Sequence, residues 1–185
     1  MLFSSLNFLL IFLPLLFISY FAIPKKFVAA RRYVLMAFSF IFYACGEPIY
    51  FFAILFCVFV TWAVSKKISE RKGWAFALAM AVNLVPLIIF KYLNFIILNI
   101  NLIPFINIPA VNLTMPIGIS FYTFQMLTYV IDLYKGEVKQ QKNFGYLALY
   151  IFLFPQLIAG PIVRYQDVEI DIGQCKENWE SIKIG

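Results

Sequence analysis

Long runs without charged side chains, separated by short basic clusters, constrain the fold of this chain more than any other feature. Residues 2 to 23 contain no charged residue, and residues 74 to 98 contain only Lys91. A helix needs about 20 apolar residues to cross the roughly 30 Å hydrocarbon core of a bilayer. The runs therefore predict membrane-spanning helices. The composition agrees, because only 13% of the residues are charged and 63% are hydrophobic.

Proline, glycine and basic clusters divide the chain into about six predicted transmembrane or re-entrant helices. They are residues 2 to 23, two short antiparallel helices within 33 to 64 that meet at Gly46-Glu47-Pro48, and residues 74 to 98, 116 to 134 and 144 to 163. Two proline sites interrupt the last element, so we expect it to be broken or re-entrant. The sequence thus predicts an all-α, polytopic integral membrane protein with a single membrane domain over residues 1 to 185.

The positions of Lys and Arg predict how the chain is oriented. Eleven of them lie in residues 25 to 32, 66 to 72 and 135 to 142, and none lies in the loops 46 to 48 and 99 to 115. By the positive-inside rule the basic loops are cytoplasmic and the N-terminus faces outward. These short clusters are topology signals and predict no nucleic-acid partner. The polar tail 164 to 185 ends as though a new helix had begun, which predicts a truncated chain.

Residues 115 to 136, MPIGISFYTFQMLTYVIDLYKG, carry polar side chains inside a predicted span. Gln125, Thr128 and Asp132 fall within about 60° of one another on a helical wheel. A charge facing lipid at a helix centre costs about 2.5–3.5 kcal/mol, so this face should turn toward other helices or a water-filled cavity. A simpler alternative is that Asp132 reaches headgroup water or pairs with Lys135, while Thr128 bonds to its own backbone.

A second polar cluster surrounds the proline sites of the last element. Gln156 follows Pro155, and Arg164 follows Gly160-Pro161. Proline frees a backbone carbonyl and glycine allows close approach, so irregular backbone here could line a cavity. Arg164 can bind a phosphate or carboxylate with two hydrogen bonds. Alternatively, it anchors a helix end at the headgroups.

Several kinds of active site are excluded by the residue types present. The chain contains no histidine, which excludes Ser-His-Asp and Cys-His arrangements and the HExxH metal site. It has no glycine-rich phosphate loop, and we predict no metal site. From the residues alone, the chain is a membrane protein with one polar seam and no complete active site.

Four segments, in order and spacing, resemble the membrane-bound O-acyltransferase family, specifically the N-terminal part of its bacterial alginate O-acetyltransferase branch. The D-alanine transfer protein of teichoic acid synthesis is a more distant relative. The segments are FSFIFYACGEPIYF (38 to 51), FKYLNF (90 to 95), MPIGISFYTFQMLTYVIDLYKG (115 to 136) and FPQLIAGPIVRY (154 to 165).

This resemblance implies a ring of helices in the inner membrane around a thin central region. There an acyl group, carried by acetyl-CoA or another acyl carrier on the cytoplasmic side, is transferred to a hydroxyl of a polysaccharide such as alginate. Partner proteins outside the membrane assist. A histidine base is implied downstream of the matched segments, so we predict no catalytic residue here and expect the isolated chain to be inactive.

The resemblance also implies which residues contribute to the reaction chamber. The expected lining of a cavity or channel is Lys91, Tyr92, Gln125, Thr128, Asp132, Gln156 and Arg164, and the expected backbone-shaping residues are Pro116, Gly118, Pro155, Gly160 and Pro161. Two other functions remain open. In a small transporter or channel subunit, Asp132 and Arg164 would line the pathway, whereas an inactive remnant would insert without doing chemistry.

Overall fold

The computed structural model describes residues 6–24, 26–46, 48–103, 105–113, 115–116, 118–153 and 164–166, which form helices and no strand. In chain order the helices are η1 (Phe8–Phe12), α1 (Leu13–Ala22), α2 (Val28–Gly46), α3 (Pro48–Ser69), α4 (Gly73–Leu87), η2 (Ile88–Tyr92), α5 (Leu93–Ile100), α6 (Ile119–Lys135) and α7 (Phe144–Phe152), where η marks a π-helix. Because η1 continues into α1, and η2 joins α4 to α5, these elements form six continuous rods. The prediction of an all-helical membrane protein is confirmed.

Three of the described rods are long and apolar enough to cross a membrane, namely Val28–Gly46, Pro48–Ser69 and Gly73–Ile100. The expectation of two short helices within 33 to 64 is therefore wrong, since these helices have 19 and 22 residues. Their backbones continue into the neighbouring basic clusters, where the charged side chains find partners or water. The predicted boundary between them is confirmed, because α2 ends at Gly46 and α3 begins at Pro48.

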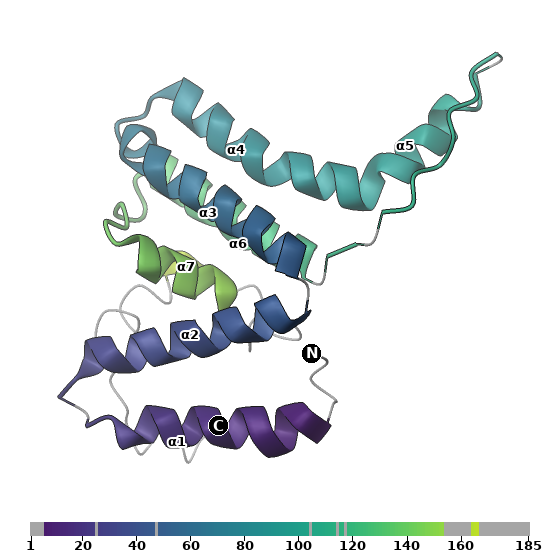
Figure 1. Ribbon diagram of the computed structural model, residues 1–185. Coiled ribbons are helices and arrows are strands. Elements are labelled where there is room, and N and C mark those ends of the chain that lie inside the picture. Colours follow the sequence, from purple (N-terminus) through teal and green to yellow (C-terminus); the bar gives the residue numbers. More distant parts are fainter. Residues whose placement is uncertain are drawn as a thin grey trace.

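The short helix α7 lies between α2 and the pair formed by α3 and α6 (Figure 1), and it contacts all three. Its sequence, FGYLALYIF, is apolar on every side, and residues 147 to 152 are buried without interruption. A helix that is apolar all round belongs in a protein interior. The side chain of Asn143 begins this helix by accepting a hydrogen bond from the Gly145 N–H, at 2.8 Å.

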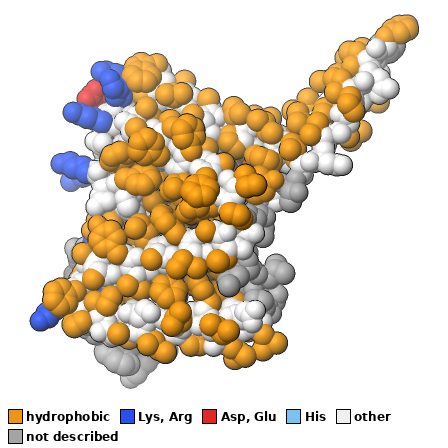
Figure 2. Space-filling view, viewed as in Figure 1, with side chains coloured by type: hydrophobic (Ala, Val, Ile, Leu, Met, Phe, Trp, Pro, Cys, Tyr) orange, Lys and Arg blue, Asp and Glu red, His pale blue; other side chains and the backbone are white. Residues whose placement is uncertain are grey.

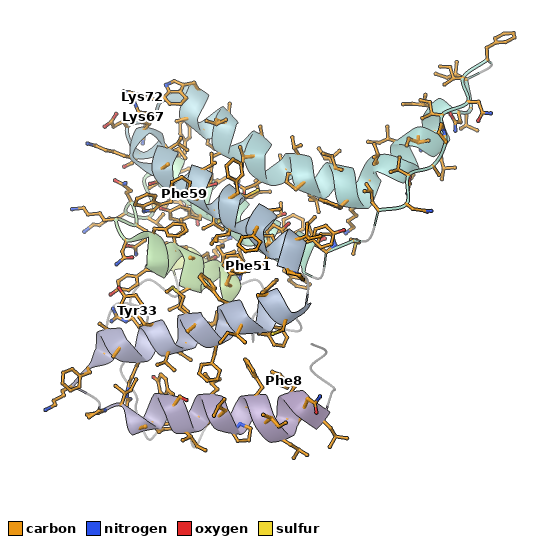
Figure 3. All side chains as sticks on the ribbon, in the orientation of Figure 1. Phe8, Tyr33, Phe51, Phe59, Lys67 and Lys72 are labelled. Atoms are coloured by element: carbon orange, nitrogen blue, oxygen red, sulfur yellow. The ribbon has the colours of Figure 1, made fainter. Side chains whose placement is uncertain are left out.

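Aromatic rings fill the spaces between the helices. Phe51 and Phe59 lie on α3 (Figure 3), and their rings contact the two ends of α7. The ring centroids are 5.3 Å apart for Phe51 and Phe152, and 5.8 Å apart for Phe59 and Phe144. Such tilted and edge-to-face pairs contribute about 0.5–1.5 kcal/mol each beyond their buried area. They fix the depth of α7 relative to α3.

The surface separates apolar from basic side chains. Figure 2 shows apolar groups over most of the visible face, whereas the Lys and Arg groups visible there gather at one end. This end holds the start of α2, the end of α3 and the end of α6. An apolar surface of this extent is unstable in water and is suited to lipid. The basic loops share one end, as the positive-inside argument requires, although the side that they face stays a prediction.

Candidate functional site

Helix α6 (Ile119–Lys135) carries the predicted polar face, and glycine marks both of its ends. Gly118 has a φ of 76° and Gly136 a φ of 85°, a left-handed conformation that glycine adopts without steric cost. The Gly136 N–H donates to the Leu133 carbonyl at 3.2 Å, and the Glu137 N–H donates to the Asp132 carbonyl at 2.9 Å. These bonds form a Schellman motif, which ends the helix next to Asp132.

The polar face of α6 points into the protein. Gln125 is 2% exposed and Asp132 is 6% exposed, whereas Phe124, on another face, is 47% exposed. Thr128 is half-buried, and its Oγ1 donates to the Gln125 carbonyl at 2.8 Å. Thr128 therefore follows the simpler alternative of bonding to its own backbone. That this face lines a cavity remains a prediction.

A cluster of tyrosines around Gln141 lies on the same side of α6, toward its basic end. The Gln141 backbone N–H donates to the Tyr129 hydroxyl at 3.2 Å, and its Nε2 donates to the Tyr165 hydroxyl at 2.7 Å. The Tyr165 ring is buried against the rings of Tyr129 and Tyr150, with centroids 4.9 Å and 5.3 Å away. We call Tyr129, Gln141, Tyr150 and Tyr165 the tyrosine cluster. It holds the chain at Tyr165 against α6 and α7.

The tyrosine cluster holds the chain next to Arg164 near the end of α6 that carries Asp132. Arg164 directly precedes Tyr165 and is exposed, whereas Asp132 is buried on α6. Within the described part of the chain, Asp132 Oδ2 has no hydrogen-bond partner. Lys135, the alternative partner, pairs instead with Glu137 at 3.7 Å. A buried carboxyl can accept from a hydroxyl or amide donor, and an exposed arginine can hold an anion.

Lys91 and Tyr92 belong to a different place. Both lie in η2 and are exposed, and Lys91 Nζ donates to Ser120 Oγ in the first turn of α6, at 3.2 Å. Ser120 and Asp132 are twelve residues apart, about 18 Å along a helix. The predicted lining residues that the structure describes therefore divide into two groups at opposite ends of α6, with Gln125 between them.

The backbone-shaping residues fall partly within the described chain. Gln156, Pro155, Gly160 and Pro161 lie outside the described residues, as does most of the predicted tail. Of the other two backbone-shaping residues, Pro116 is buried and Gly118 begins α6. Among the residues that are described, no group of three or more His, Cys, Asp or Glu side chains could hold a metal ion.

Sequence reasoning missed two buried arginines and a buried asparagine. Arg31 donates from Nε and Nη2 to the Ile23 carbonyl, at 3.0 Å and 2.8 Å, which ties α2 to the end of α1. Arg32 Nη1 donates to the Tyr146 hydroxyl at 2.6 Å, which ties α2 to α7. The basic cluster gave no signal of this role, because the partners lie 8 and 114 positions away, outside the cluster itself. Asn83, by contrast, is polar within an apolar run and could have been identified.

The fold and the inward polar face define a helical membrane protein with ionisable groups in its interior. Proteins of similar sequence identify a narrower class. The chain is 34% identical over 183 residues to the probable alginate O-acetylase of Azotobacter vinelandii, covering 91% of this chain and 35% of the relative. It is 29% identical over 200 residues to the peptidoglycan O-acetyltransferase of Helicobacter pylori, covering 91% of the chain and 38% of the relative.

A more distant relative is the teichoic acid D-alanyltransferase of Bacillus subtilis, 28% identical over 120 residues, which covers 61% of the chain and 29% of the relative. No family model and no solved structure matches the chain. The chain is thus related to bacterial O-acyltransferases, which confirms the resemblance inferred from the four segments. It spans about a third of the length of the alginate relatives.

Proposed function

We propose that this chain forms part of a membrane O-acyltransferase that transfers an acetyl or related acyl group to a hydroxyl of a cell-envelope or extracellular polysaccharide such as alginate. The observation that carries the proposal is the 34% identity to alginate O-acetylases over 91% of the chain. The inward polar face of α6 supports it, because acyl transfer across a bilayer needs polar groups inside the helix bundle.

In this proposal the donor, acetyl-CoA or another acyl carrier, arrives at the basic end of the bundle, which faces the cytoplasm in the inner membrane. The N-terminus then faces outward, and partner proteins on that side bring the polysaccharide. Asp132 and Arg164 lie nearest to the donor. Lys91 and Tyr92 lie nearest to the acceptor, and Gln125 lines the wall between the two groups. Gln156 is a further lining residue that the resemblance implies.

The transfer itself needs a base. The acceptor oxygen forms a bond to the acyl carbon, the bond to the carrier breaks, and the hydroxyl proton passes to a general base, which typically contributes about 10²–10⁴-fold to the rate. These 185 residues contain no histidine. We therefore assign them the walls of the reaction chamber and not the base.

A chimera tests the proposal. The part of the Azotobacter vinelandii alginate O-acetylase that aligns with this chain is replaced by residues 1–185, in a strain that makes alginate but lacks its own acetylase. We expect acetyl esters on the polymer, measured by NMR. Alanine at both Gln156 and Arg164 should reduce them, whereas the control Phe124→Ala should not.

The proposal fails if the chimera inserts at the level of the native enzyme and the alginate carries no more acetyl groups than in the empty-vector strain. A second assay addresses the transport alternative. Ion flux through liposomes that contain only this chain would favour a channel or transporter subunit. We expect no flux above that of protein-free liposomes.

A further inference from the structure

Helix α5 leaves the bundle together with the segment that follows it (Figure 1). Turns at Leu102, Ile103 and Ile106 reverse the chain, through hydrogen bonds to the carbonyls of Asn99, Ile100 and Ile103. Residues 105–113 then run back along α5. We call residues 93–103 and 105–113 the arm. It projects from the end of the bundle opposite the basic loops.

Two asparagines fasten the returning segment to the helix. Asn94 Nδ2 donates to the Val111 carbonyl at 2.9 Å, and its Oδ1 accepts from the Val111 N–H at 3.0 Å. Asn101 makes the same pair of bonds to Ile108, at 2.9 Å and 2.8 Å. The two asparagines are seven positions apart and lie within about 20° of one helix face. Each asparagine side chain thus provides the donor and the acceptor that the backbone of a neighbouring strand would provide in a β-sheet.

The outer sides of the arm are apolar. Ile97, between the two asparagines, is buried, but most of the other large side chains are exposed. Those that are at least half exposed are Phe95, Leu98, Leu102, Ile103 and Phe105. No charged residue occurs between Lys91 and Asp132 in the sequence. An uncharged apolar surface with no described protein cover is poorly suited to water.

The length of the helical rod Gly73–Ile100 indicates how far the arm lies from the centre of the bilayer. Residues Gly73–Ile100 form 28 residues of continuous helix, about 42 Å at 1.5 Å per residue, which exceeds the roughly 30 Å hydrocarbon core. The rod bends where Pro86 and η2 interrupt the regular hydrogen bonds, and exposed Lys91 and Tyr92 lie at this bend. Lysine and tyrosine are typical of the membrane–water boundary.

We propose that the arm lies in the lipid interface of the membrane face opposite the basic loops, with its apolar sides against the acyl chains and its remaining backbone groups near water. The extended segment cannot lie deeper, because irregular backbone is not tolerated where it faces hydrocarbon. The asparagine bonds satisfy four of its backbone groups. The arm therefore anchors the bundle beside the position where η2 meets α6.

Depth-dependent fluorescence quenching tests this inference. The native cysteines are replaced by alanine, and a single environment-sensitive probe is attached at Phe105→Cys or, independently, at Leu102→Cys, in vesicles of phosphatidylglycerol and phosphatidylethanolamine. We expect a nitroxide at position 5 of the acyl chain to quench the probe at least twofold more than one at position 12. Iodide in the buffer should quench it several-fold less than a probe at Lys72→Cys.

Two control sites calibrate the measurement. A probe at Phe56→Cys, exposed in the middle of α3, should be quenched more by the position-12 nitroxide, and Lys72→Cys should respond mainly to iodide. The inference is overturned if both arm probes respond to iodide like Lys72, to the deep nitroxide like Phe56, or to neither quencher, which would indicate protein cover. Replacing Asn94 and Asn101 together by alanine should increase iodide quenching at Ile108→Cys.

Discussion

Gln141 donates from Nε2 to the hydroxyl of Tyr165 at 2.7 Å, across 24 positions of sequence. The Oε1 of the same glutamine accepts from the Asn143 N–H at 2.9 Å, so both polar atoms of the Gln141 amide are hydrogen-bonded. Through this contact the loop after α6 positions the chain at Arg164. The chain next to the predicted arginine is thus held against the loop after α6 by a contact that neither segment specifies by itself.

Removing the Tyr165 hydroxyl should therefore weaken the fold only slightly. We expect Tyr165→Phe to lower the free energy of unfolding by about 0.5–1.5 kcal/mol, because Gln141 is half-buried and can turn toward water. Tyr165→Ala removes the buried ring as well and should cost about 3–5 kcal/mol. Unfolding by SDS in mixed micelles measures both. Tyr33→Phe, at an exposed tyrosine of α2, is the control and should have no effect, and equal losses in both Tyr165 variants would contradict the packing role.

Asp132→Asn should separate stability from activity. The amide has the shape of the carboxyl but lacks the buried charge, so the free energy of unfolding should stay constant or rise by about 1 kcal/mol. A hydrogen bond to a charged group is worth about 1.5–3 kcal/mol, so losing one in the transition state should slow acetyl transfer by the chimera roughly tenfold to hundredfold. Acetyl content and SDS unfolding of the same preparations check this. A destabilised variant with full activity would make Asp132 purely structural.

The inward direction of α6 could be predicted because a helical wheel needs only local sequence. Gln125 and Asp132 share a face whatever surrounds the helix, and the cost of exposing that face to lipid gives its direction. The length of α2 could not be predicted in this way. Arg31 and Arg32 were assigned to a loop, but they lie in the helix because the Ile23 carbonyl and the Tyr146 hydroxyl bind them there.

The path of the arm could not be predicted from local sequence either. The sequence indicates an uncharged loop over residues 99 to 115, which is where the chain reverses. Its course along α5 depends on Asn94 and Asn101, whose partners are 17 and 7 positions away. Asparagine is common in loops of every shape, so composition alone does not predict these pairings.

Arg71 should be replaceable by glycine but not by alanine. It occupies the left-handed position of a Schellman motif at the end of α3, with a φ of 57°, and its Nη2 donates to the Lys135 carbonyl at 3.3 Å. A side chain in this conformation costs about 1–2 kcal/mol. Arg71→Ala keeps the backbone strain and removes the hydrogen bond to Lys135. Arg71→Gly removes the same bond but also relieves the strain. We expect the glycine variant to be about 1 kcal/mol more stable than the alanine variant in SDS unfolding, and the reverse order would refute the argument.

Glu70 should titrate below its ordinary range. Its Oε2 lies 3.1 Å from Lys72 Nζ, and the hydrogen bond and charge of Lys72 lower the pKa of the exposed Glu70 carboxyl. Because the folded pKa is lowered, the stabilisation is complete above the ordinary glutamate pKa of about 4.3 and is lost as the pH falls through the folded value. Carbon-13 NMR should show the pKa of Glu70 rising in Lys72→Met. The control Lys135→Met, which breaks only the pair with Glu137, should leave it unchanged, and a Glu70 pKa indifferent to Lys72 would contradict this cause.

Asn83 and Thr61 should be energetically coupled across the interface of α3 and α4. Asn83 Nδ2 donates to Thr61 Oγ1 at 2.9 Å, and Thr61 Oγ1 donates to the Cys57 carbonyl at 2.9 Å, with both side chains fully inside the bundle. Interhelical hydrogen bonds in membrane proteins average about 0.6 kcal/mol in double-mutant cycles and reach about 1.7. We expect a coupling in this range from Asn83→Ala and Thr61→Val. Thr61→Ser keeps the hydroxyl and should preserve the coupling, whereas additive single-mutant effects would mean that the bond contributes nothing to helix association.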